Sequence, residues 1–306
     1  MKKKWLFLNN LSLKIIACVA MTLDHLGIFL DFYLTDASYE PFITALRIIG
    51  RIALPIFVYL VFEGCRKTKD IKKYLMRLVI ASLILYLFII LTFVITPNIG
   101  FEFGTGFFLE NIFFTMFLLV LTYYSLFKKT RAWQGFLIII PILFVVGGFI
   151  YEVASQNGAF EYTTQFQGFI DGIMPQYQFE ALIMFLIVAV SNFFYEKNIK
   201  KSLGIEGEQL KAVIDSDQSQ IYRNIMMIIG TVIVSLICEG LTYVSNIGPY
   251  LINAEIRQKE AWFLIASLFI IFYNGKLGPS NKITKYGFYI YYPMHIGLLA
   301  LIFMLI

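Results

Sequence analysis

The chain has 306 residues, of which 59% are hydrophobic and only 15% are charged, with a formal net charge of +5. A soluble globular protein has about 25% charged and about 45–50% apolar residues, so this composition excludes an ordinary soluble domain. It also excludes a disordered chain, which needs low hydrophobicity and a high net charge. Because no compact basic module stands apart from the apolar residues, we expect no nucleic acid partner.

Long apolar segments predict an all-α integral membrane protein, because a bilayer core of about 30 Å needs about 20 mostly apolar residues per helix. Nine candidate spans follow one another along the chain: 11–33, 46–64, 78–95, 107–127, 133–151, 179–195, 221–243, 261–273 and 286–306. The eighth is short and is tilted, re-entrant or wrongly bounded. The sequence therefore predicts a polytopic helical bundle of about nine transmembrane helices, forming a single membrane domain over residues 1–306.

Lysine and arginine residues gather in alternate gaps between these spans. The cation-rich segments are 2–4, 66–77, 128–131, 197–211 and 276–285. Since cytoplasmic loops carry an excess of Lys and Arg, this pattern predicts a cytoplasmic N-terminus and a multi-pass protein of the cell membrane. The largest external segment, 152–178, is either an ordinary loop or an external platform for a substrate.

Ionisable residues inside a span are costly unless they face a cavity or a partner. They are Asp24 and His25 in the first candidate span, Arg47, Arg51 and Glu63 in the second, Glu239 in the seventh and His295 in the ninth. At ~1.5 Å per residue, His25 lies about 20 Å and His295 about 14 Å above the inner ends of their helices, near the middle of the membrane. An imidazole there can act as a base, an acid, a nucleophile or a metal ligand. Because no third ligand accompanies the two rings, we expect no metal.

Helical phase relates several of these residues. Lys14 and His25 are eleven residues apart, which is about three helical turns, so they share a face. Lys14 either snorkels to the inner headgroups or lies at the cytoplasmic mouth of a channel that has His25 deep inside. Asp24 points about 100° away from His25 and is better placed to pair with a neighbouring helix. Arg47 and Arg51 share a face and need anionic partners such as Asp24, Glu239 or a bound ligand.

Several motifs, taken in order, resemble the TraX family, the conjugal-transfer pilin acetylases. They are 13–17 (LKIIA), 24–27 (DHLG), 46–57 (LRIIGRIALPIF), Glu63-Gly64, Thr68, Tyr74, Arg77-Leu78, Asn111 with Phe114-Thr115, and Tyr292-Pro293 with His295. The resemblance covers about the first third of the chain and two short islands. Leu54 departs from the family, which has an aromatic residue at that place.

The resemblance implies a membrane acetyltransferase that modifies the amino terminus of pilin. More distantly, the chain is similar to the transmembrane acyltransferase-3 superfamily, whose members transfer acetyl from cytosolic acetyl-CoA to an extracytoplasmic acceptor. In that superfamily a histidine on the first helix lies at the reaction centre, and His25 occupies the matching place. The Lys-, Ile- and Phe-rich composition favours a Gram-positive bacterial source, so the acceptor is either a pilin terminus or another surface peptide or glycan.

This resemblance suggests a role for each candidate residue. The catalytic candidates are His25 as base or acyl carrier, Asp24, Arg47, Arg51 and His295. The candidates for binding the phosphates of an acyl-CoA donor are Lys14, Arg66, Lys69 and Arg77. The candidates for binding substrate are Glu63, Asn111, Thr115 and Tyr292. The alternative is a transporter or flippase for an anionic, lipid-linked substrate, in which the buried Asp, His and Arg groups form a relay.

Overall fold

The computed structural model describes residues 5–34, 36–95, 111–156, 174–175, 177–247, 258–279 and 281–305. Their regular structure is helical, which confirms the predicted all-α class. The chain forms two compact units, one of Met1–Glu63, Ile183–Leu241 and Glu255–Ile306, the other of Gly64–Leu182 and Thr242–Ala254. The predicted external platform lies largely outside the described residues, since 157–173 and 176 are not among them.

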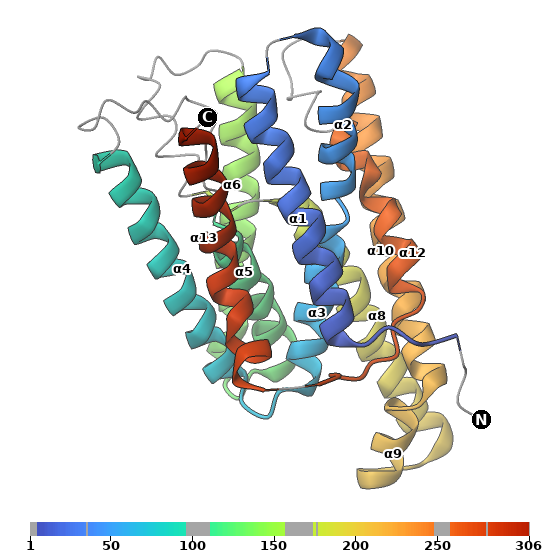
Figure 1. The fold of residues 1–306 in the computed structure, drawn as a ribbon. Coiled ribbons are helices and arrows are strands. Elements are labelled where there is room, and N and C mark those ends of the chain that lie inside the picture. The colour runs from blue at the N-terminus through green and yellow to red at the C-terminus, as the bar shows by residue number, and fades with distance from the viewer. Residues whose placement is uncertain are drawn as a thin grey trace. The chain divides into compact units, whose positions relative to one another are not determined.

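The first unit contains both histidines and most of the helices in Figure 1. Its elements are α1 (Asn10–Tyr33), a 3₁₀ turn (Ala37–Tyr39), α2 (Glu40–Gly50), α3 (Ala53–Lys67), α8 (Phe179–Leu203), α9 (Gly207–Ile214), α10 (Asp217–Ile247), a 3₁₀ helix (Ala261–Ala266), α12 (Ser267–Ile270) and α13 (Lys282–Met304). Three of these helices, α3, α8 and α10, continue into the second unit. Within the first unit, α1 lies beside both α2 and α13 (Figure 1).

The second unit contains α4 and α5 side by side, followed by α6. Its elements are α4 (Ile71–Ile95), α5 (Ile112–Tyr123), a π-helical turn (Tyr124–Lys128), a 3₁₀ helix (Ala132–Ile138) and α6 (Ile139–Gln156). Asp70 caps the start of α4, because its Oδ1 accepts the backbone N–H of Lys73 at 3.1 Å. This bond lowers the pKa of the Asp70 carboxyl, so the cap is charged at neutral pH.

Six helices among the described residues are long and apolar enough to cross a membrane: Asn10–Tyr33, Ala37–Lys67, Ala132–Ser155, Phe179–Leu203, Asp217–Val244 and Tyr286–Phe303. A shorter apolar helix covers Ile112–Lys128. The protein therefore has the helices of a multi-pass membrane protein. The total of about nine spans and the cytoplasmic N-terminus stay predictions.

The second predicted span differs from the structure in its bounds and its continuity. The helical segment begins at Ala37 rather than at 46, and α2 and α3 are separated by Arg51 and Ile52. Pro55 explains the break, because proline has no N–H and its ring clashes with the carbonyl four residues earlier, that of Arg51. The N–H groups of Arg51 and Ile52 bond to carbonyls three residues back, at 3.1 and 3.2 Å. The proline thus sets where α2 ends and α3 begins.

The eighth predicted span, 261–273, is helical only to Ile270. The helical run covers residues 258–270, and its rise of about 20 Å is shorter than a bilayer core of about 30 Å. The segment ends against the N-terminal residues, where Leu8 accepts from Asn274 at 2.8 Å and donates to Phe272 at 3.0 Å. Gly278 completes this contact, since its φ of +74° suits glycine and an added Cβ would lie 2.6 Å from the Asn9 side chain.

Candidate active site

The two histidines of the chain contact each other in the first unit. Nε2 of His295 lies 3.3 Å from Nδ1 of His25, and the ring planes are 79° apart. Each ring also bonds to its own helix, since His25 Nδ1 lies 2.8 Å from the Met21 carbonyl and His295 Nδ1 lies 2.9 Å from the Tyr291 carbonyl. Tyr292 packs edge-on against both imidazoles. Three predicted site residues, His25, His295 and Tyr292, are therefore neighbours.

Two hydroxyl groups meet between α1 and α13, about one helical turn on the N-terminal side of each histidine. Thr22 Oγ1 and the Tyr291 hydroxyl are hydrogen-bonded to each other. They lie 3.0 and 3.3 Å from the backbone carbonyl of Cys18. The Tyr291 ring stacks on the His295 imidazole, with a centroid distance of 5.1 Å and an interplanar angle of 13°. The sequence did not single out Tyr291 because the family-like motif begins at Tyr292.

Lys14 lies on the same side of α1 as His25. Its Nζ is 4.8 Å from the centre of the Phe288 ring of α13, and its side chain is half-buried. Both Lys14 and His25 thus face α13, as their spacing predicts. Lys14, Thr22 and His25 of α1 each contact α13, and we call this row the polar stripe, with the ammonium group at one end and the imidazoles at the other.

A carboxylate and two guanidinium groups form a second cluster beside the histidines, between α1 and α2. Asp24 Oδ2 lies 3.1 Å from Arg47 Nη1, and Asp24 Oδ1 lies 3.8 Å from Arg51 Nη2. Arg47 also donates to the Asp24 backbone carbonyl at 3.3 Å. Asp24 is 7% exposed and Arg51 is 4% exposed. The predicted pairing of Asp24 with a neighbouring helix is confirmed, and its partners are the two arginines.

Gly50 allows α1 and α2 to approach closely enough for this cluster. A Cβ atom at Gly50 would lie 2.2 Å from Cβ and 2.5 Å from Oδ1 of Asp24. These distances are far below van der Waals contact, and the clashing atoms lie close to the backbone of α1. The helices would have to separate to admit even a methyl group.

Gly50→Ala is therefore expected to lower the free energy of unfolding by about 1–3 kcal/mol through overpacking. Thermal unfolding of the detergent-purified protein measures the change. Gly297→Ala on α13 is the matched control, because nothing lies within 4 Å of the added Cβ and alanine favours the helix by up to about 1 kcal/mol. Equal stability of the two variants would contradict the close approach at Gly50.

Glu63 forms a buried ion pair with Arg223 of α10, and its predicted role in binding substrate stays a prediction. Arg223 Nε is 3.1 Å from Glu63 Oε1, and each side chain is 1% exposed. The pair continues into a polar network, because Arg223 donates to Gln220 Oε1 at 2.8 Å and Gln220 donates to the Tyr59 hydroxyl at 3.0 Å. Asn224 accepts from both Tyr59 and Gln220. The run QIYRN at 220–224, polar at the start of an apolar segment, was the signal that could have indicated this network.

The other cations predicted to bind CoA belong to the second unit. Lys69 is exposed, and Arg66 and Arg77 are half-buried. The Arg77 guanidinium lies 5.5 Å from the Tyr74 ring centre. Binding of CoA phosphates by these residues stays a prediction.

Asn111 and Thr115 lie at the start of α5 in the second unit, and both are buried. The Asn111 amide donates to the Ser82 carbonyl at 2.9 Å, and its oxygen accepts the N–H of Phe114 at 3.1 Å. Asn111 therefore caps α5 and ties it to α4. Its role toward a substrate stays a prediction.

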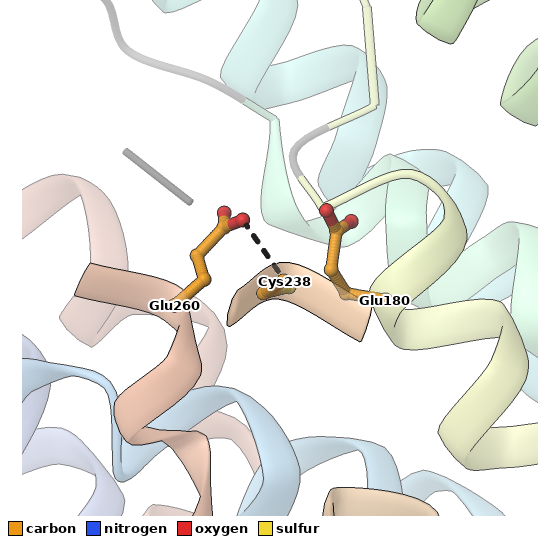
Figure 2. A group of neighbouring side chains, drawn as sticks. All are labelled: Glu180, Cys238 and Glu260. Atoms are coloured by element: carbon orange, nitrogen blue, oxygen red, sulfur yellow. Dashed lines mark hydrogen bonds between the residues drawn. The ribbon is translucent and has the colours of Figure 1, made fainter. Parts of the chain in front are cut away.

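A thiol and a carboxylate also meet in the first unit. Figure 2 shows the weak hydrogen bond from Cys238 Sγ to Glu260 Oε2, at 3.9 Å. Glu180, labelled in the same view, is a buried carboxylate of the second unit. Cys238 is fully buried and Glu260 is 4% exposed.

Comparison with known proteins identifies a family. The family model described as TraX protein matches residues 10–211, well beyond the motifs in the first third of the chain. A probable fimbrial assembly protein FimC, serogroup H1, of Dichelobacter nodosus is 36% identical over 73 residues, which are 24% of this chain and 28% of that protein. The match thus spans less than a third of the relative's length. No solved structure matches the chain.

Proposed function

We propose, because the chain belongs to the TraX family, that it is a membrane-bound acetyltransferase. The donor is cytosolic acetyl-CoA, and the acceptor is an amine or hydroxyl group on the outer side of the membrane. The family is linked to pilin acetylation, and the curated relative is named for fimbrial assembly. An amino terminus of a surface peptide is therefore the first acceptor to test, followed by a surface glycan.

The contact between His25 and His295 is the observation that carries this proposal. Two imidazoles held 3.3 Å apart provide a proton acceptor of the kind that acyl transfer requires. His25 removes a proton from the acceptor while the nitrogen or oxygen of the acceptor attacks the carbonyl carbon of the thioester. A C–N or C–O bond forms, the C–S bond breaks, and the proton passes to the departing CoA thiolate. General base catalysis of this kind contributes about 10²–10⁴-fold in rate.

An acetyl-imidazole on His25 is the other possible route, in which the ring carries the acetyl group before the acceptor attacks. In both routes a negative charge develops on the thioester oxygen, and nearby cationic donors would stabilise it. Arg47 and Arg51 are the proposed donors, since Asp24, which binds both, is the neighbour of His25 in the chain. Lys14 is the proposed contact for CoA at the other end of the polar stripe.

Inverted membrane vesicles supplied with radiolabelled acetyl-CoA test the proposal. We expect label to appear on material inside the vesicles only when the gene is expressed, and mass spectrometry of that material identifies the acceptor. We also expect acetyl-CoA to raise the unfolding temperature of the purified protein, because a ligand that binds the folded state stabilises it. A transporter of an anionic lipid-linked substrate predicts neither result, and the absence of both would overturn the proposal.

A further inference from the structure

We infer that the two histidines have different roles, with His25 reacting through its Nε2 atom and His295 acting as a positioning residue. In this arrangement His295 accepts the Nδ1 proton of His25 and does not touch the substrate. The catalytic roles of the two histidines rest on the proposed acetyl transfer. The positions of their ring protons follow from the hydrogen bonds alone.

The backbone carbonyls determine where the ring protons lie. A carbonyl oxygen can only accept a hydrogen bond, so a ring nitrogen close to it must carry a proton. His25 Nδ1 is 2.8 Å from the Met21 carbonyl, and His295 Nδ1 is 2.9 Å from the Tyr291 carbonyl. Both rings therefore carry the proton on Nδ1. In a neutral ring the lone pair is then on Nε2.

The contact between the rings adds a second constraint. The Nδ1–H of His25 lies between the Met21 carbonyl and His295 Nε2, which is 3.3 Å away, and it is shared between them as a three-centre bond. A proton on His295 Nε2 would make two N–H donors face each other at that distance. A further proton can therefore enter the pair only at Nε2 of His25. This is the nitrogen that takes the proton from the acceptor and returns it to the CoA thiolate.

Tyr291 is a second positioning residue in this arrangement. Its carbonyl accepts the Nδ1 proton of His295, and its ring stacks on the His295 imidazole. Its hydroxyl bonds to Thr22 and to the Cys18 carbonyl of α1, which holds α13 against α1 one turn from the imidazoles. Tyr291 thus contacts His295 through its carbonyl and its ring, while its hydroxyl holds the two helices together.

Nuclear magnetic resonance of ¹⁵N-histidine-labelled protein tests the protonation pattern without any assay of activity. The chain contains only 2 His, so the spectrum holds two imidazoles. We expect both neutral rings to carry a proton on Nδ1 and none on Nε2. Because the same pattern is expected for both rings, neither signal has to be assigned to its residue with a variant. A neutral ring protonated at Nε2, in either histidine, would overturn the inference.

Kinetics of His295→Phe tests the roles. Misplacing a catalytic group can cost up to about 10²-fold in rate, so we expect kcat to fall by as much as that factor while KM for acetyl-CoA stays the same. Tyr291→Phe keeps the ring and the carbonyl, and we expect a smaller fall in kcat with unchanged KM. If His295→Phe lost as much activity as His25→Phe, or if its KM rose in parallel, His295 would contact substrate and the assignment would be wrong.

The ring protonation and the proposed acetyl transfer are tested by different measurements, so each can be overturned separately. Wild-type protein that shows the expected ring protonation but transfers no acetyl group would overturn the proposed function and, with it, the catalytic roles. Wild-type protein that transfers acetyl groups but shows a different ring protonation would overturn only the division of roles between the histidines.

Discussion

Replacing His25 by alanine is expected to lower acetyl transfer by about 10²–10⁴-fold, because the variant lacks the only nitrogen of the pair that can take the proton of the acceptor. Label transferred from acetyl-CoA by vesicles with equal amounts of protein measures the effect. We expect the KM for acetyl-CoA to change little, since Lys14 and the other proposed phosphate contacts remain in place.

Asp31→Ala is the matched control for His25→Ala. Asp31 lies on the same helix and is exposed, so its loss tests insertion and folding of α1 without touching the imidazoles. We expect this variant to retain transfer close to the wild-type rate. Transfer by His25→Ala within about threefold of Asp31→Ala would exclude His25 as base and as acyl carrier.

Arg223→Met is expected to cause the largest loss of stability, about 3–5 kcal/mol, because it removes the guanidinium that lies 3.1 Å from the buried Glu63 carboxylate. A typical domain is stable by only about 5–15 kcal/mol, so this loss removes a large part of the total. Unfolding of the detergent-purified protein by heat or by denaturant measures the change in stability.

The double variant Glu63→Leu/Arg223→Met distinguishes this cause from general damage to α10. Removing both charges also removes the cost of the buried Glu63 carboxylate, so the double variant should be more stable than Arg223→Met alone. Lys73→Met is a second control, because the Lys73 side chain is 82% exposed in its pair with Asp70 and its loss should change stability little. A double variant less stable than Arg223→Met would show that the ion pair is not the cause.

Apolar length predicted most of the helices because each span must be long and hydrophobic whatever it packs against. The helical phase of residues on one helix was equally informative. It predicted that Lys14 and His25 share a face and that Asp24 points about 100° away from His25. Both predictions concern a single helix, where backbone geometry alone fixes the relation between residues.

Partners across helices could not be predicted in the same way. His25 and His295 are 270 positions apart, and nothing in either segment specifies the other. Tyr291 and His295 lie one turn apart on α13 and share a face, but whether that face meets α1 depends on how α13 is rotated against α1. Glu63 was singled out as an isolated charge, whereas its partner Arg223 was overlooked because the ion pair needs the packing of α3 against α10.

The meeting of α1 with α13 also has a consequence for biogenesis. A ribosome delivers α1 to the membrane early, and His295 follows only after nearly all of this sequence has been synthesised. Until α13 inserts beside α1, the His25 ring keeps its bond to Met21 but has no second imidazole. A chain arrested before α13 would therefore occupy the membrane without the paired imidazoles, so the proposed acetyl transfer would have to wait until α13 has inserted.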